Sequence, residues 1–229
     1  MALDVRPKQK GFPWGRTFFL VVLLALLALT GWYGYRWYMY GDELPIDIPV
    51  FATANSRIDE TEVTQEEVDA HTVAPAEPRY LSIPSLGIVK ARVLGMGLTE
   101  QGALADPERL DDVAWYNADG VTPGSGGVMV MNGHNGGVSR NGLFATLSAL
   151  QTGDTIDIER GDGKVFRYEV RENQSMSLAD VNDTGMKLMM QSVEAGKEAL
   201  NIMTCDGKWV PRLEQYDRRV LVRAVRIDV

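Results

Sequence analysis

The chain has 229 residues, of which 45% are hydrophobic and 24% are charged, and its formal net charge is −8. This length suits one domain with appendages, or two small domains. The charge is uneven: residues 1–40 carry a net +4, residues 41–79 a net −8, and the remainder a net −4. Beyond residue 40 there is no basic patch of the kind that neutralises phosphates, which argues against nucleic-acid binding.

The first predicted element is an apolar helix over residues 17–35, where the sequence TFFLVVLLALLALTGWYGY carries no charge. A bilayer core of about 30 Å needs roughly 20 helical residues, so this run is long enough to span it. Four basic residues precede the run and only Arg36 follows closely. This asymmetry predicts a cytoplasmic N-terminus (residues 1–16) and an extracytoplasmic remainder. A cleaved signal peptide is the alternative, but bulky aromatics occupy the place of a small-residue cleavage site. We expect an uncleaved signal anchor in the cell membrane.

An acidic segment over residues 36–78 follows the predicted span. It is rich in Glu, Asp, Pro, Thr and Ala and has few large apolar side chains. Such a composition buries little surface, so we expect a solvated extracytoplasmic stalk. Residues 42–51 are apolar enough to fold back on the following domain. His71 lies in this stalk, and we expect it to be exposed and to have no functional role.

The remaining residues, 79–229, have the sequence pattern of a β domain. About 150 residues are enough to form one stable hydrophobic core. Short apolar or alternating runs are separated by Gly and Asp turns, which predicts an all-β antiparallel sandwich or barrel. The clearest runs are VMVMN (128–132), DTIDIER (154–160), KVFRYEVRE (164–172), ALNIMT (199–204) and RRVLVRAVRID (218–228). Two helical patches are predicted, one capped by Asn141 and one over residues 186–198.

Cys205 is the only cysteine of the chain, so it cannot form an internal disulfide. It ends an apolar run and precedes Asp206-Gly207, a strong turn signal. The thiol is therefore expected at a strand exit, where a side chain meets solvent beside a rigid scaffold. The alternative is a buried cysteine that packs as a small hydrophobe, which is common for free cysteine.

Two other positions carry side chains that suit cysteine chemistry. His134 lies at the end of the run VMVMN, among glycines that free the backbone. Arg218 and Arg219 lie in the final run. A neighbouring imidazolium or guanidinium lowers a thiol pKa, a histidine can protonate a leaving amine, and an arginine can stabilise an oxyanion. The alternatives are a turn histidine without a task and a solvated strand face, and spacing alone does not bring these residues together.

The order of these features resembles the sortase family: a signal anchor, a stalk, and an all-β domain with His, Cys and Arg in that order. The sequence NIMTC (201–205) resembles the family's Thr-Leu-x-Thr-Cys motif, with Asn201 and Ile202 in place of Thr and Leu. Around His134, a Trp-Tyr segment and a Pro-Gly turn lead into a run ending Gly-His, and Phe-x-x-Leu and Gly-Asp follow, as in the family. The likeness extends over residues 79–228.

The resemblance implies a closed eight-stranded β-barrel with one or two short helices, and the activity of a cysteine transpeptidase. Cys205 would attack the Thr–Gly bond of an LPxTG-like sorting signal, forming a thioester, and His134 would act as general acid and base. Arg219 would hold the substrate and the oxyanion, with Arg218 in reserve, since strand neighbours face opposite sides. Thr204, the residue of the family motif next to the nucleophile, is expected to contact the substrate.

The partners implied by the resemblance are the sorting signal of a surface protein and an amine of a peptidoglycan precursor or a pilin. No cofactor is expected. Some sortases bind calcium near a position like the acidic group Asp106, Glu108, Asp111 and Asp112, although we favour an ordinary solvated turn. Surface-protein anchoring is favoured over pilus assembly, because residues 36–78 contain no Asp-Pro and no second apolar span follows.

Three other functions compete with this interpretation. An L,D-transpeptidase would have a Ser/Thr-His-Gly-Cys cluster, whereas Ile-Met-Thr precedes Cys205. A papain-like peptidase generally places its cysteine before its histidine, which is the reverse of the order found here. A non-catalytic, membrane-tethered binding domain is the third, and slow thiol alkylation would indicate it.

Overall fold

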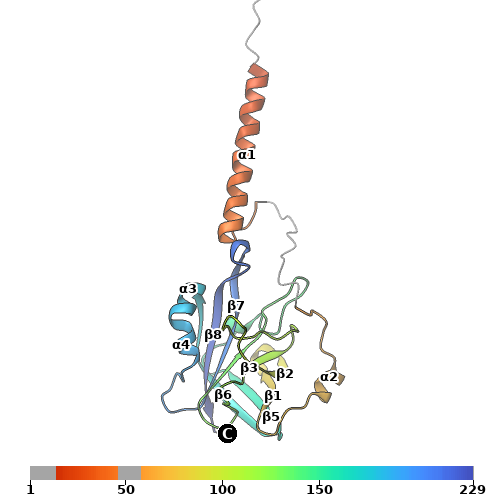
Figure 1. Cartoon of the computed structure of the whole chain (residues 1–229), viewed down its shortest axis with the longest axis vertical. Coiled ribbons are helices and arrows are strands. Elements are labelled where there is room, and N and C mark those ends of the chain that lie inside the picture. The colour runs from red at the N-terminus through yellow and green to blue at the C-terminus, as the bar shows by residue number, and fades with distance from the viewer. Residues whose placement is uncertain (1–13, 46–57, 229) are drawn as a thin grey trace, which may run out of the picture. The chain divides into compact units, whose positions relative to one another are not determined.

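The computed structural model describes residues 14–45 and 58–228, which are drawn in colour in Figure 1. The helices and helical turns are α1 (Trp14–Tyr40), α2 (Gln65–Ala70), η1 (Pro84–Leu86), η2 (Leu147–Ala149), α3 (Leu178–Asp180), η3 (Val181–Gly185), α4 (Met186–Met189) and η4 (Pro211–Leu213). The strands are β1 (Pro78–Ile83), β2 (Ile88–Met96), β3 (Val113–Tyr116), β4 (Val128–Asn132), β5 (Thr155–Arg160), β6 (Val165–Ser177), β7 (Ala199–Val210) and β8 (Gln215–Ile227). The chain divides into a unit containing α1 with residues 210–212 and a larger unit containing the barrel.

Helix α1 has 27 residues and extends beyond the predicted run at both ends. By length and composition it is a candidate membrane span. It ends at Gly41, whose positive φ of 66° and N–H bond to the Trp37 carbonyl (2.9 Å) form a glycine C-terminal cap. The basic residues Arg6, Lys8 and Lys10, on which the predicted orientation rests, lie outside the described part of the chain.

The strands close into a barrel with the order β1-β2-β3-β4-β7-β8-β6-β5, which confirms the eight-stranded fold that the resemblance implied. The expectation of a wholly antiparallel arrangement was wrong, because β2 pairs with β3 and β4 pairs with β7 in parallel. Parallel neighbours need a long crossover connection. For β4 and β7 that connection contains β5, β6 and the helical segment α3–η3–α4 (Figure 1).

The barrel interior is filled by alternate side chains of the strands, all of them buried. Met129 and Met131 of β4 and Leu200 and Ile202 of β7 are fully excluded from solvent. Each side chain of this size contributes about 1.5–3 kcal/mol when buried. Met129 pairs with Leu200 and Met131 with Ile202, so these buried residues anchor the two parallel strands side by side in the core.

Both predicted helical patches differ from the structure. The segment after Asn141 forms turns and the short η2, although its apolar face (Phe144, Leu147 and Leu150) is buried as its spacing indicates. The other helical segment lies over residues 178–189 instead of 186–198. Its start is set by Ser177, whose hydroxyl accepts the Asp180 N–H in an N-cap.

The predicted division at residue 79 also differs from the structure, because residues 58–77 lie against the barrel. Helix α2 begins in a capping box formed by Thr64 and Glu67. The Tyr80 hydroxyl donates to the Val68 carbonyl. The expectation of an exposed His71 was wrong: it is half-buried, with Nε2 3.1 Å from the Val93 carbonyl. The folded domain thus includes these residues, and only residues 46–57 of the predicted stalk lie outside the described chain.

Candidate active site

The parallel pair β4 and β7 brings His134 and Cys205 to the same end of the barrel. Asn132, the last residue of β4, pairs with Met203 of β7. His134 and Cys205 are each two residues further along their chains, and parallel strands run in the same direction. Strand β8, which carries both arginines, is the next neighbour of β7. Three residues that are far apart in sequence therefore belong to adjacent parts of one barrel wall.

The expectation that Cys205 lies at a strand exit was wrong, because β7 continues to Val210. Thr204, within β7, is joined by a side-chain hydrogen bond to Gly133, the residue that follows β4. Its hydroxyl donates to the Gly133 carbonyl at 2.9 Å, and Thr204 is only 4% exposed. A Cβ atom at position 133 would lie 2.9 Å from the Phe144 ring, so glycine lets the ring pack closely against the backbone there. The expected substrate contact of Thr204 does not fit this geometry, because its hydroxyl is buried and already used. The bond links the backbone just before Cys205 to the backbone just before His134.

The Cys205 thiol is half-buried at this end of the barrel. Burial raises its pKa above the ordinary value, the nearby Arg219 guanidinium opposes that shift, and the Asp106 carboxylate adds to it. The net direction is upward, so the thiol is protonated in the resting protein at neutral pH. Attack by Cys205 thus requires a group that removes its proton.

His134 is half-buried and held at two points. Its ring Nε2 lies 2.7 Å from the Pro107 carbonyl oxygen, and its backbone carbonyl accepts the Phe144 N–H at 2.9 Å. Because a carbonyl oxygen only accepts, Nε2 is the protonated nitrogen in this contact. Nδ1 is then the nitrogen able to accept a proton while the imidazole is neutral.

The two candidate arginines of β8 point to different partners. Arg218 donates to the hydroxyl (2.9 Å) and the carbonyl (2.7 Å) of Ser175 on β6. Arg219 donates through Nη1 to the Tyr216 (2.9 Å) and Arg218 (2.8 Å) carbonyls, and its charge acts on Cys205. Of the two, Arg219 is the one whose charge lowers the pKa of the thiol.

Sequence reasoning missed two residues that border the site, Pro107 and Tyr216. Pro107 belongs to the loop between β2 and β3, and no motif marked it. Asp106, in the same loop, was named only as part of an acidic group and not as a neighbour of the thiol. Burial, and after it the neighbouring Cys205, raise the pKa of the Tyr216 phenol. The Pro-Gly and Gly-His turns indicated where the strands end, but they gave no sign of which loop would cover the imidazole.

The acidic residues near the site are engaged with protein partners. Arg140 binds the two Asp111 carboxylate oxygens at 2.8 and 2.9 Å, and Arg92 binds those of Asp112 at 2.8 Å each. The Asp106 carboxylate accepts from the Asn132 amide at 2.7 Å. Among residues 14–45 and 58–228, no group of three or more His, Cys, Asp or Glu side chains is arranged to hold a metal ion.

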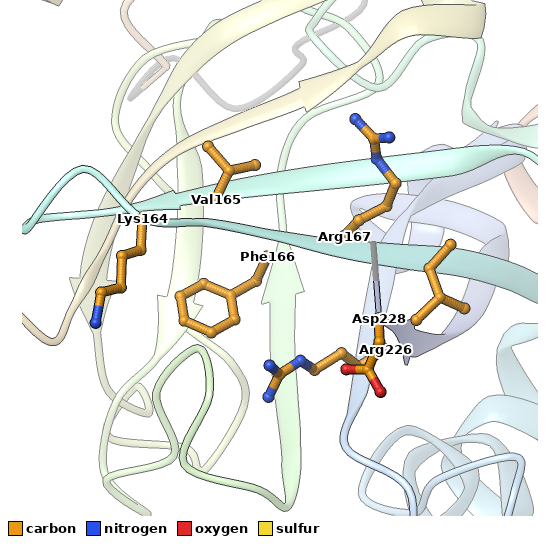
Figure 2. Close-up of a pocket in the computed structure, with 7 residues that line it drawn as sticks. Lys164, Val165, Phe166, Arg167, Arg226 and Asp228 are labelled. Atoms are coloured by element: carbon orange, nitrogen blue, oxygen red, sulfur yellow. The ribbon is translucent and has the colours of Figure 1, made fainter.

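Two pockets of the barrel unit differ in their relation to Cys205. One, of about 450 Å³, is lined by residues 135–141, Ala145, Thr146 and Tyr216, next to His134. The other, of about 300 Å³, lies where β6 begins and β8 ends, and Figure 2 shows the Phe166 ring beside Arg226 there. Arg219 is near the opposite end of β8, so only the first pocket adjoins the candidate site.

Comparison with known proteins gives one family. The family model described as "Sortase domain" matches residues 81–227. Among solved structures, the chain is similar to a lid mutant of sortase A from Corynebacterium diphtheriae, with 21% identity and a TM-score of 0.50 over 72% of this chain and 77% of that one.

Two further solved structures resemble the chain. A sortase D5 transpeptidase from Clostridium perfringens has 20% identity and a TM-score of 0.47 over 72% of this chain and 90% of that one. Sortase C1 from Streptococcus agalactiae has 21% identity and a TM-score of 0.47 over 73% and 78%. No curated protein sequence matches the chain.

Proposed function

Because the chain belongs to the sortase family of cysteine transpeptidases, we propose that it cleaves an LPxTG-like sorting signal and transfers the acyl group to a cell-wall or pilin amine. The observation that supports this proposal is that Cys205, His134 and Arg219 belong to adjacent parts of one barrel wall. This adjacency follows from the parallel β4–β7 pair and the neighbouring β8.

The proposed reaction begins with a protonated thiol. Nδ1 of His134 takes the Cys205 proton as sulfur attacks the carbonyl carbon of the Thr–Gly bond. The imidazolium then protonates the departing glycine amine, and a thioester remains on Cys205. An acceptor amine then attacks the thioester carbonyl and gives a proton to Nδ1 of His134 as the new C–N bond forms. The C–S bond breaks, and the imidazolium returns that proton to the Cys205 sulfur.

Arg219 is proposed to stabilise the oxyanion of both tetrahedral intermediates. A guanidinium has five N–H donors, and Arg219 uses two on backbone carbonyls and one on the Gln215 side chain (3.3 Å). These contacts hold the group in place and leave two donors for the substrate. Fixed donors of this kind stabilise developing charge without reorganising during the reaction.

Helix α1 is proposed to anchor the enzyme in the cell membrane as a single span, with a cytoplasmic N-terminus and an extracytoplasmic barrel. The composition of α1 and the basic residues that precede it support this topology. Protease added to intact cells stripped of their wall should digest the barrel. Protection of the barrel until the cells are lysed would contradict the proposal.

The decisive experiment uses the full chain in detergent with a library of LPxTG-type peptides and two amines, triglycine and a lysine peptide. Mass spectrometry should detect an acyl-enzyme on Cys205 and an amide product whose mass identifies the accepted amine. Cys205→Ala should form neither, and His134→Ala should lose turnover. A folded wild-type protein that forms no acyl-enzyme with any peptide would exclude the proposal.

A further inference from the structure

The strap, which we define as residues 58–64, contacts two loops that border the candidate active site. It belongs to the part of the chain whose composition predicted a solvated stalk. Two of its residues, Asp59 and Glu60, are adjacent in sequence but bind different loops. Asp59 binds the loop between β2 and β3, and Glu60 binds the hairpin of residues 135–142.

The first loop carries the hydrogen-bond partner of the imidazole. The Pro107 carbonyl lies 2.7 Å from His134 Nε2, and the next carbonyl, that of Glu108, accepts the Asp59 N–H at 2.7 Å. The Asp59 carbonyl in turn accepts the Leu110 N–H at 3.3 Å. The strap therefore holds the backbone on both sides of Arg109, two residues after the partner of the imidazole.

Arg109 attaches the same loop to the strap by its side chain. Its Nη2 donates to the carbonyls of Thr61 (3.3 Å) and Glu62 (3.1 Å), and its Nη1 donates to the Glu67 carboxylate at 2.6 Å. The Thr64 backbone amide and Arg109 together lower the pKa of Glu67 to about 2. The Glu67 carboxylate is thus ionised at neutral pH, and its contact with Arg109 is an ion pair.

The second loop is a tight hairpin that starts directly after His134. Gly142 N–H donates to the Asn135 carbonyl at 3.0 Å, and Gly137 N–H donates to the Arg140 carbonyl at 2.9 Å. A side chain added at Gly142 would run into the His134 carbonyl. The hairpin and the backbone of His134 are therefore in direct contact, so a shift of the hairpin would displace His134.

Glu60 binds the tip of this hairpin. Its carboxylate accepts the N–H groups of Val138 and Ser139 (the second at 2.9 Å) and the Ser139 hydroxyl, and its carbonyl accepts from Arg140 Nε at 2.7 Å. A side chain at Gly137 would collide with the Glu60 carboxylate. Hydrogen bonds from backbone amides to a carboxylate are charge-assisted, so this is the strongest kind of contact that the strap makes with the hairpin.

We propose that Glu60 is a positioning residue for His134, and that the strap fixes the imidazole by holding both the loop that bonds its ring and the hairpin that follows its backbone. This inference rests on the proposed role of His134 in acyl transfer. Loops at the rim of a barrel are otherwise its most mobile parts. Displacement of a catalytic group by about 1 Å can lower a rate by roughly 100-fold.

The test compares the full-length wild type with Glu60→Gln and Glu60→Ala in detergent. Glu66→Gln is the matched control, because Glu66 is exposed and its side chain makes no hydrogen bond or ion pair within the described residues. Glu60→Gln keeps the size of the side chain but replaces one acceptor oxygen by a donor. All variants are assayed well below their unfolding temperatures, so that loss of fold does not enter the rates.

We expect kcat for acyl-enzyme formation to fall about tenfold in Glu60→Gln and further in Glu60→Ala, with KM for the sorting peptide changed less than about twofold. Hydrogen exchange should become faster at residues 137–140 and stay unchanged in the barrel strands. The ring resonances of His134 in NMR spectra should shift in both variants. Glu66→Gln should match the wild type in all three measurements.

Two results would overturn the inference: unchanged exchange at residues 137–140, or faster exchange there with kcat and the His134 resonances as in the wild type. If the wild-type protein itself forms no acyl-enzyme, the proposed function fails separately. The His134 resonances then decide the inference alone, since they report the position of the imidazole without any reaction.

Discussion

Replacement of Thr204 by valine removes one hydroxyl and keeps the shape of the side chain. The hydroxyl is buried and donates a hydrogen bond to the Gly133 carbonyl, which is also buried. Leaving such an acceptor without a partner costs about 1–3 kcal/mol. No cavity is created, so this loss should be the main contribution to the change in the free energy of unfolding. At about 2–4 °C per kcal/mol for a domain of this size, Tm should fall by several degrees.

The same bond connects the residues that precede Cys205 and His134, so activity should fall as well. We expect thioester formation by Thr204→Val to slow by about tenfold at a temperature where the variant is fully folded. Thermal unfolding of the full chain, followed by tryptophan fluorescence, gives the stability. Single-turnover acylation with a sorting peptide gives the rate.

Thr152→Val is the control for this substitution. Its hydroxyl also donates to a carbonyl, that of Arg171 at 3.2 Å, but Thr152 is exposed and water can replace the bond. Its stability should stay within about 0.5 kcal/mol of the wild type. If Thr204→Val were as stable and as fast as Thr152→Val, the assignment of a positioning role to Thr204 would be wrong.

Three other predictions concern charge. Arg219→Ala should lower the single-turnover acylation rate about 10²–10³-fold and Arg218→Ala far less; the reverse order would exchange their roles. Asp106→Asn removes an anion that raises the pKa of Cys205, so the pH profile of thiol alkylation should move to lower pH, and no shift would contradict this proximity. Burial lowers the pKa of His71, so its stabilising contribution is complete above about pH 6.5 and is lost as pH falls through the folded-state pKa. Hydrogen exchange in α2 should become faster over that interval in the wild type and much less so in His71→Gln.

The position of His134 just after a strand followed from the sequence, because the apolar run of β4 ends at Asn132. The expected strand exit at Cys205 was wrong, because β7 continues to Val210 and the Asp206-Gly207 pair does not end it. The adjacency of the two residues in the barrel wall did not follow from the sequence. It depends on the parallel pairing of β4 with β7, and the residues that set this register, Asn132 and Met203, are about 70 positions apart. A one-residue slip of this register would turn one side chain to the other face of the sheet. The closed barrel came from the family resemblance and not from the strand pattern, which indicated antiparallel pairing.

The strap was missed because composition does not distinguish a solvated acidic residue from one that has a fixed partner. Glu60 counts as a charged residue in a polar segment, yet it binds amides 78 and 79 positions away. These contacts bury little apolar surface, so hydrophobic patterning contains no trace of them. Residues 58–77 would have been removed by a domain boundary placed at Arg79, and with them the contacts that hold both loops around His134.

The protonation state of Cys205 explains why such supports matter in this site. Where burial and Asp106 raise the thiol pKa more than Arg219 lowers it, little thiolate is present in advance and the proton must be transferred as sulfur attacks. The rate then depends on an imidazole that is already in place, with Nε2 held by Pro107 and Nδ1 free to accept. Changes at Glu60 and Thr204, which touch neither the proposed substrate nor the thiol, should therefore lower kcat more than they change KM. A site that kept a stable thiolate would be less sensitive to both, so the two variants together test whether geometry or pKa limits the reaction.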